Sequence, residues 1–292
     1  MSNVLVMTDS VACIPRELAE EYKIAVFPAA NIHINGETYI DGVTISPTQA
    51  YDFIRKDPDR FITSALAPGD VVSEFRKIES RVESILVITM SSALSALFKT
   101  VTLAADSFQE QSPGTSIRVW DSRTCAGAQG LVVLAAAKAA AQGMTMDQVA
   151  DVAEKVREET GGIMLLDTLR YIYRTGRMSK TASRLASILN IRPINWLTDE
   201  GKVEFLGRAR KREDGMKRLV ELVKEKADSD SLHFLVSHAA APGMADRVIE
   251  LLRQDFNCLS LTLSEYSPVM GYGAGPGSIF VGFQPELDLF NG

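Results

Sequence analysis

The chain has few cysteines, few histidines and no excess of basic residues, and each shortage narrows the classes of protein it can belong to. Its three cysteines lie far apart, so they form neither a disulfide framework nor a C-x-x-C metal or redox motif. It has only three histidines, so few residues could act as the histidine base of a hydrolase triad. The formal net charge of −6 argues against nucleic-acid binding, which requires a basic surface.

Long apolar runs are also absent. The most apolar stretch, near residues 131–141, carries Lys138 and is too short to span a bilayer. The sequence VLVMT follows the start directly, and no basic residue precedes Arg16, so the n-region of a signal peptide is missing. We therefore expect a cytoplasmic protein without stable membrane insertion. Hydrophobic residues make up 46% of the 292, which is enough for a large core.

In the first 160 residues, short apolar runs alternate with helical segments. The runs are VLVMT (4–8), ILVIT (85–89) and IRVW (117–120), and helical segments follow from Pro15, Ser95 and about Thr124. Such alternation predicts a parallel sheet with helices on its faces.

Several turn and cap signals support this reading. Ser46 and Pro47 provide an N-cap and a first-turn proline, while Thr145 with Gln148 forms a capping box ahead of a helix that runs to about Thr160. Between NIHI and ETYI, Asn35-Gly36 predicts a hairpin with a type I′ turn, because both residues tolerate positive φ.

Gly161-Gly162 interrupts the alternation, and we place a lobe boundary there. The fold class predicted is α/β with two lobes: residues 1–161 form a parallel sheet flanked by helices, and residues 162–292 form an α+β lobe with a smaller, mixed sheet. The second lobe is expected to contain helices at about 163–174 and 179–189 and strands near 193–197, 203–208, 232–237, 259–263 and 279–283.

Hydroxyl-bearing residues follow three of the predicted strands, as Asp9-Ser10, Ser91-Ser92 and Asp121-Ser122. Ligands of open parallel sheets bind beyond the carboxyl ends of the strands. Ser95 stands where a loop becomes a helix, so an anion there meets a hydroxyl and the positive end of a helix dipole. Thr63-Ser64 adds two hydroxyls ahead of a helix that begins at Pro68.

Two other interpretations of these residues remain open. Ser, Thr and Asp most often serve as caps and turn formers. A catalytic serine needs a base and a nucleophile elbow such as G-x-S-x-G, and neither is evident. An enzyme or sensor that acts on a small hydroxylated or phosphorylated metabolite is the alternative to a binding protein.

Six motifs, in order over roughly 270 residues, resemble those of the DegV family. They are TDSVACIP, ITSALAP, TMSSALSALFKT, VWDSRTCAGAQG, YRTGRMSKTASRLASILNIRPI and SPVMGYGAGPGS. The resemblance implies a single DegV-like unit that holds one long-chain fatty acid between its lobes. It implies neither a cofactor nor a metal, and no catalytic residue. The better understood members present the lipid to a bacterial fatty acid kinase, which phosphorylates the carboxylate.

The resemblance also assigns residues. The carboxylate-binding threonine and serine of the family fall on Thr63 and Ser95. The wider substrate site is expected to include Ser64, Ser92, Ser122, Gly271, Tyr272 and Gly273. Gly273 stands where the family usually carries a histidine. The neighbouring residue in the sequence, Tyr272, has a hydroxyl that could take the place of that histidine. The glycine-rich segment is alternatively a tight turn.

Basic residues recur at helical spacing and again after a predicted strand. They are Arg170, Arg174, Arg177, Lys180 and Arg184, followed by Arg208, Arg210, Lys211 and Arg212. We assign kinase docking to Arg177, Arg208 and Arg210, since a basic face on an acidic protein suits an acidic partner. A solvated helix face explains the same spacing. A regulatory scaffold with a vestigial pocket is a third hypothesis.

Overall fold

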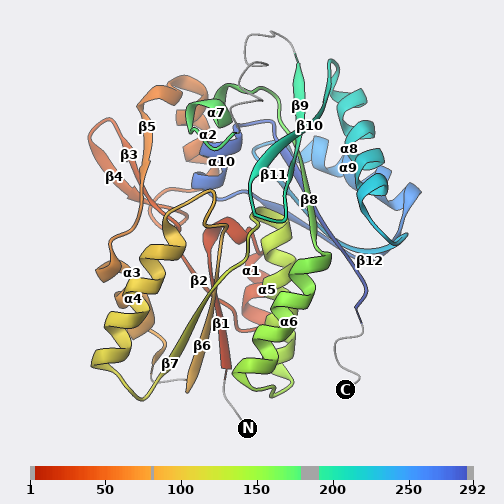
Figure 1. Cartoon of the computed structure of the whole chain (residues 1–292). Coiled ribbons are helices and arrows are strands. Elements are labelled where there is room, and N and C mark those ends of the chain that lie inside the picture. Colours follow the sequence, from red (N-terminus) through yellow and green to blue (C-terminus); the bar gives the residue numbers. More distant parts are fainter. Residues whose placement is uncertain (1–3, 80–81, 179–190, 288–292) are drawn as a thin grey trace.

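In the computed structural model, residues 4–79, 82–178 and 191–287 are described, and three sheets organise them. The first is a parallel sheet of four strands in the order β2-β1-β6-β7, in the lower half of Figure 1. Its strands are β1 (Val4–Asp9), β2 (Ala25–Phe27), β6 (Ser84–Thr89) and β7 (Ser116–Asp121). This confirms the parallel sheet predicted from the sequence.

Helices cover both faces of this sheet (Figure 1). On one face lie α3 (Pro68–Arg76) and α4 (Leu97–Gln111), and on the other α5 (Ala126–Ala141) and α6 (Met146–Glu159). The short α1 (Arg16–Glu21) follows β1. The predicted capping box of Thr145 and Gln148 is present at the start of α6, where Thr145 Oγ1 accepts from the Gln148 N–H.

The second sheet has six strands in the order β10-β9-β8-β13-β11-β12. They are β8 (Gly161–Leu165), β9 (Arg192–Leu197), β10 (Val203–Ala209), β11 (Ser231–His238), β12 (Asn257–Glu265) and β13 (Ile279–Pro285). Only β11 and β12 pair in parallel within this sheet, which is therefore mixed, as predicted. On one face pack α8 (Arg212–Lys226) and α9 (Pro242–Asp255). The prediction that it is the smaller sheet was wrong.

The predicted helix at 163–174 was also wrong over most of its length. Residues 161–165 form β8, a strand between β9 and β13, and only α7 (Arg170–Arg174) is helical. A strand buried on both faces is apolar throughout and lacks the alternation that marks a half-exposed strand. Gly161 and Gly162 fit because the rings of Phe283 and Phe280 occupy the space of their missing side chains. The helix predicted near 179–189 lies outside the described residues.

A small antiparallel sheet of β4-β3-β5 lies at the upper left in Figure 1. Its strands are β3 (Asn31–Ile34), β4 (Glu37–Ile40) and β5 (Phe61–Ser64). Asn35 and Gly36 have φ of 52° and 87° in the two-residue turn, so the predicted type I′ hairpin is confirmed. Nearby, α2 (Pro47–Lys56) begins with a Ser46–Gln49 capping box and packs on α10 (Pro268–Ala274).

Helix α5 packs against both large sheets. It contacts β1 of the parallel sheet and β11 and β13 of the mixed sheet. Its sequence, AGAQGLVVLAAAKAAA, is almost entirely small and apolar, as expected of a helix buried on all sides. A side chain at Gly127 would collide with the carbonyl oxygen of Leu235, so glycine permits the close approach. The division at 161/162 stays a prediction, although β8 begins at that point.

Candidate functional site

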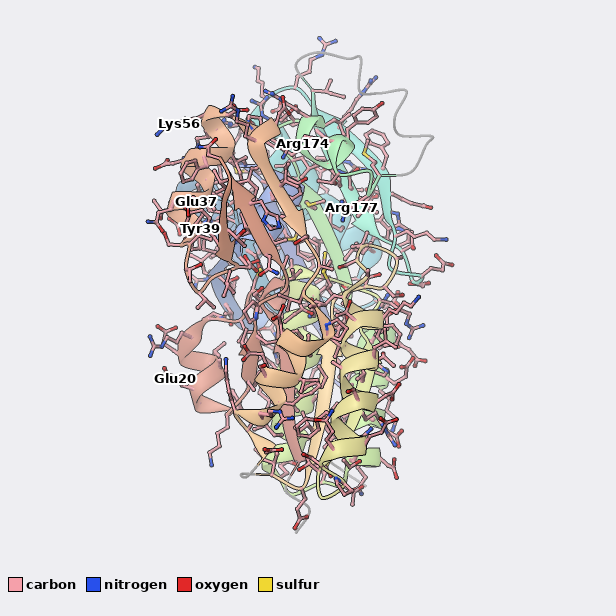
Figure 2. The ribbon with its side chains drawn as sticks, turned by 90° about the vertical axis from the view of Figure 1, so that its left-hand side faces the viewer. Glu20, Glu37, Tyr39, Lys56, Arg174 and Arg177 are labelled. Atoms are coloured by element: carbon pink, nitrogen blue, oxygen red, sulfur yellow. The ribbon has the colours of Figure 1, made fainter. Side chains whose placement is uncertain are left out.

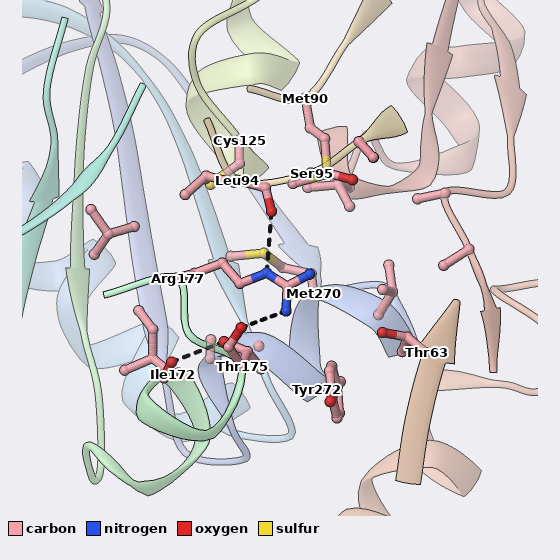
Figure 3. A pocket seen from close by; sticks show the side chains of 18 of the residues that line it. Thr63, Met90, Leu94, Ser95, Cys125, Ile172, Thr175, Arg177, Met270 and Tyr272 are labelled. Carbon is pink, nitrogen blue, oxygen red and sulfur yellow. Dashed lines mark hydrogen bonds between the residues drawn. The ribbon is translucent and has the colours of Figure 1, made fainter. Parts of the chain in front are cut away.

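A cavity lies beyond the carboxyl ends of the parallel strands (Figure 3). Its volume is about 210 Å³. The lining draws on loops after β1, β6 and β7 and on β5, β8, β10, α7 and α10. Most of it is aliphatic or methionine, and Arg177 is its one charged residue among those described.

Thr63 and Ser64 both contribute to the lining, but their side chains differ in direction. Successive side chains of a strand point to opposite faces. The hydroxyl of Ser64 is 2.9 Å from Nε2 of His33, whose Nδ1 lies 3.0 Å from Oγ1 of Thr38. The hydroxyl of Thr63 makes no hydrogen bond to any residue in the described ranges, so it is free to meet a ligand.

Ser95 lines the cavity just before α4, and its Oγ accepts a hydrogen bond of 3.2 Å from the backbone N–H of Leu97. Since an accepting hydroxyl still carries its own hydrogen, Ser95 can donate to an anion. Its position at the N-terminus of a 15-residue helix adds the positive end of the dipole. Ser95 therefore lies where a loop becomes a helix, the position that the sequence predicts.

Ser92 and Ser122 are not brought to the cavity. Ser92 is exposed, and its backbone N–H donates to Oδ1 of Asp121 over 3.1 Å. Ser122 is fully buried; its hydroxyl donates to the carbonyl of Thr124 and accepts from the N–H of the same residue, both at 3.2 Å. Both belong to turns, the ordinary role of Ser and Asp.

The glycine-rich segment forms α10 and the loop after it, rather than a continuous turn. Gly271 packs on the ring of Tyr51 and lies outside the lining. Gly273 lines the cavity, and no atom lies within 4 Å of the position that a Cβ would take. Gly275 ends the helix with a φ of 85°. Of the predicted glycines, only Gly273 borders the ligand space, and Tyr272 borders it with its side chain (Figure 3).

Arg177 was assigned to partner docking, yet it forms part of the cavity wall. Its Nε donates to the carbonyl of Leu94 over 3.2 Å, and its Nη1 donates to the carbonyl of Thr175 over 2.6 Å. Figure 3 shows the guanidinium between Ser95 and Thr175, with Thr63 across the same space. No carboxylate pairs with Arg177 in the described part of the chain. Its positive charge is therefore available to an anionic ligand.

The other basic residues lie elsewhere. Arg208 and Arg210 are exposed, on β10 and just after it, and neither lines the cavity. Arg174 lies 4.8 Å from the ring centroid of Tyr272, and Figure 2 shows Arg174 and Arg177 in the upper half of the molecule. Lys180 and Arg184 lie outside the described residues. The docking role of Arg208 and Arg210 stays a prediction.

Two buried carboxylates hold the segments that line the cavity. Asp9 accepts from the N–H of Met90 over 2.7 Å and from that of Val11 over 3.0 Å. Asp41 accepts from the N–H of Val269 over 2.9 Å and from the hydroxyl of Ser10. Burial raises the pKa of each carboxyl from 3.8 to about 6.

Little in the sequence indicates that Asp9 and Asp41 hold these segments. Asp9 belongs to the first DegV-like motif, but its type and place after a strand equally suit a turn. Asp41 follows the hairpin, and nothing in the sequence indicates that it reaches Val269, 228 positions away. Thr175 was also missed as a lining residue.

The described ranges lack both a metal-binding cluster and a helix able to cross a membrane. They contain no cluster of three His, Cys, Asp or Glu side chains that could hold a metal ion. None of the helices there combines the length and the apolar character needed to cross a bilayer.

The fold and the cavity define an α/β protein with a parallel and a mixed sheet and a largely apolar cavity, whose lining in the described ranges includes one charged residue, Arg177. The model of the DegV family, whose members it describes as uncharacterised, matches residues 3–286. A DegV domain-containing protein of Clostridium perfringens is 30% identical over 285 residues, which are 97% of this chain and 99% of the relative. The chain therefore belongs to the DegV family, as its motifs indicated.

Solved structures of the family share the fold. A DegV family protein from Thermus thermophilus, described as fatty acid binding, superimposes with a TM-score of 0.87 at 23% identity, over 97% of this chain and 100% of the other. DegV of Bacillus subtilis, described as a fatty acid binding protein, gives 0.86 at 23% identity, over 98% and 100%.

Proposed function

We propose that this protein binds a long-chain fatty acid, with the carboxylate at Thr63, Ser95 and Arg177 and the hydrocarbon tail in the cavity. The observation that carries the proposal is the character of the lining: it is largely apolar, and its one charged group in the described ranges, Arg177, has no carboxylate partner. The two structural relatives described as fatty acid binding proteins support the same ligand class.

The energetics suit such a ligand. Burying about fifteen methylenes at about 0.8 kcal/mol each gives a gross driving force of about 12 kcal/mol, from which ordering costs are subtracted. A buried carboxylate costs several kcal/mol unless it is hydrogen-bonded. Two hydroxyls and a guanidinium supply charge-assisted hydrogen bonds, which are about twice as strong as neutral ones. The tail thus provides affinity, and the polar groups fix the orientation.

Native mass spectrometry of protein purified without added ligand tests the proposal. We expect a mass increment that corresponds to one fatty acid, which organic extraction and chromatography then identify. Protein that is ligand-free and also fails to take up added hexadecanoic acid would contradict it. The double variant Thr63→Val with Ser95→Ala is the matched sample, in which occupancy should fall.

The proposal extends to a non-catalytic role beside a fatty acid kinase, with docking through the exposed Arg208 and Arg210 in the cytoplasm, where ATP is available. A basic patch on an acidic protein favours an acidic partner surface. The test is acyl-phosphate formation by a purified kinase subunit with and without this protein. The variant Arg208→Glu with Arg210→Glu should retain its fatty acid and lose phosphoryl transfer; unchanged transfer would remove the docking role.

The hydrolase alternative gains little support from the site. Ser64 and His33 are within hydrogen-bond distance, but the third member is the hydroxyl of Thr38 rather than a carboxylate. A triad relies on a buried acid to orient and stabilise the imidazolium. An ester-hydrolysis assay with Ser64→Ala as the control decides between the two functions.

A further inference from the structure

Strand β12 forms one edge of the mixed sheet and, among the described strands, pairs only with β11. It has nine residues, and its single charged residue, Glu265, is the last of them. Two of its leucines reach solvent, since Leu259 is 36% exposed and Leu263 is 39% exposed. A long edge strand with apolar side chains and no charge along its length offers its backbone to a further strand.

The other edge strands among the described residues are shorter or carry charges within their length. Strand β2 has three residues, and β4 and β5 have four each. Strand β7 carries Arg118. Strand β10 carries Glu204 and Arg208. Short length and charged side chains are usual means by which proteins keep sheet edges from pairing, and β12 has neither.

The sequence of β12 is self-complementary. Residues 260–264 read Ser-Leu-Thr-Leu-Ser, the same in both directions, with Thr262 at the centre. They follow the bulge near the start of the strand and pair regularly with β11. Two copies placed antiparallel about a two-fold axis at Thr262 would set this residue opposite itself and Leu261 opposite Leu263. Residues directly opposite share a face, so leucines would meet leucines and hydroxyls would meet hydroxyls.

The outward backbone groups of this stretch have no partner in the part of the chain that the structure describes. On its inner side the strand pairs with β11 along residues 257–265. No backbone hydrogen bond joins residues 260–264 to another described segment. The N–H and C=O groups on the outer side are therefore available for an antiparallel ladder with another strand.

Charges near the two ends of β12 are complementary across the same axis. Burial raises the pKa of Cys258 and the charge of Arg253 opposes that rise, so Arg253 lies near the start of the strand. Glu265 lies at its end. Neither charge forms an ion pair with another residue in the described ranges. A two-fold axis at Thr262 exchanges the ends, so it brings Arg253 of each copy toward Glu265 of the other, which favours this orientation.

We propose that the protein forms a two-fold symmetric dimer in which β12 pairs antiparallel with β12 of a second copy, so that the two mixed sheets join into one. The same surface of each copy forms the interface, and such a contact closes after two chains. No residue of β12 lines the cavity. The dimer therefore goes beyond the proposed fatty acid binding and does not depend on it.

Sedimentation velocity of the full chain, over a dilution series from about 1 to about 100 μM, tests the proposal. We expect an equilibrium between monomer and dimer without larger species. Thr262→Lys sets two like charges opposite each other at the axis, so the dissociation constant should rise about tenfold or more. Ser116→Lys is the matched control, because it adds the same charge to the exposed start of edge strand β7; its dissociation constant should stay within about threefold of the wild type.

A charge exchange tests the orientation. Arg253→Glu and Glu265→Arg should each weaken the dimer about tenfold, because each places like charges together at two symmetry-related positions. The double variant restores opposite signs and should return to within about threefold of the wild type. Because these two residues form no ion pair within one chain in the described ranges, such a recovery reports a contact between copies.

Circular dichroism establishes that each variant is folded. A wild type that stays monomeric throughout the series overturns the proposal, and this result decides even if a variant does not fold. A dimer that is unaffected in folded Thr262→Lys also overturns it, because the contact then lies on another surface. Open-ended association into larger species, or a folded double variant as weak as the single ones, contradicts the two-fold arrangement.

Discussion

The guanidinium of Arg174 lies 4.8 Å from the ring centroid of Tyr272, within the range of a cation–π contact. Phe61 stacks on the same ring at 5.4 Å. The guanidinium nitrogens of Arg174 are buried and have no hydrogen-bond partner among the described residues, and the ion pair of Arg174 with Asp59 is long, at 3.5 Å. The ring of Tyr272 is therefore the main contact of this cation, and together the two hold α7 and α10 beside the cavity.

We therefore expect Tyr272→Leu to lower the free energy of unfolding by about 1–3 kcal/mol, through the loss of the ring stacking with Phe61 and of the cation–π contact with Arg174. Urea denaturation at pH 7 measures this. Tyr173→Leu is the control, because Tyr173 is 54% exposed and its replacement should change stability by less than about 0.5 kcal/mol. Equal effects of the two replacements would mean that the stack contributes nothing.

Removing a head-group hydroxyl should weaken fatty acid binding. Hydrogen bonds to charged groups contribute about 1.5–3 kcal/mol, so Thr63→Val and Ser95→Ala should each lower the affinity for hexadecanoic acid about 10- to 100-fold. Calorimetry or displacement of a fluorescent fatty acid provides the measurement. Ser92→Ala, at an exposed position outside the cavity, should bind as the wild type does. Loss of affinity in Ser92→Ala would contradict the site as drawn.

The charge of Arg177 should select acids over neutral lipids. In the wild type, hexadecanoic acid should bind more tightly than hexadecanol, and in Arg177→Met the two affinities should converge to within about threefold, because the cation that favours the anion is gone. Arg210→Met is the comparison variant, since Arg210 is exposed and outside the lining. An acid preference that is the same in Arg177→Met and the wild type would exclude this role.

Asp41 should make the protein less stable as the pH rises. Its pKa is raised from 3.8 to about 6 by burial, so the folded state favours the protonated form. The contribution is fully present below pH 3.8 and is lost as the pH rises through about 6, which amounts to about 3 kcal/mol. Asp41→Asn does not titrate, so its stability relative to the wild type should increase between pH 4 and pH 7.

Urea denaturation across that range measures the difference. Asp151→Asn, at an exposed position on α6, is the matched control and should follow the wild type at every pH. If the stability difference between Asp41→Asn and the wild type does not change with pH, the carboxyl does not titrate as its burial implies.

Local signals in the sequence predicted the local structure well. Asn35-Gly36 fixes its own turn, and Thr145 with Gln148 caps its own helix, because the chemistry involves residues four or fewer positions apart. The strand at Gly161–Leu165 was missed, because what makes it a strand is the pairing with β9 and β13, distant in sequence. Residue type alone does not distinguish a strand from a helix there.

The candidate site shows the same contrast between features set by neighbouring residues and features set by residues distant in the sequence. Ser95 lines the cavity, and its place before a helix is visible in the sequence, whereas the hydroxyl of Ser122 is hydrogen-bonded within its own turn, which the sequence does not distinguish. Arg177 could be recognised as basic, but its place in the cavity lining depends on its hydrogen bonds to the carbonyls of Leu94 and Thr175.

The close contact of α5 with both large sheets limits how a ligand can exchange. At Gly127 and Gly282 the backbones of α5 and β13 touch, which leaves no soft layer of side chains along which the two sheets could slide. Packed interiors resist continuous deformation. A ligand that enters or leaves the cavity is therefore not expected to do so by a sliding of α5 over β13.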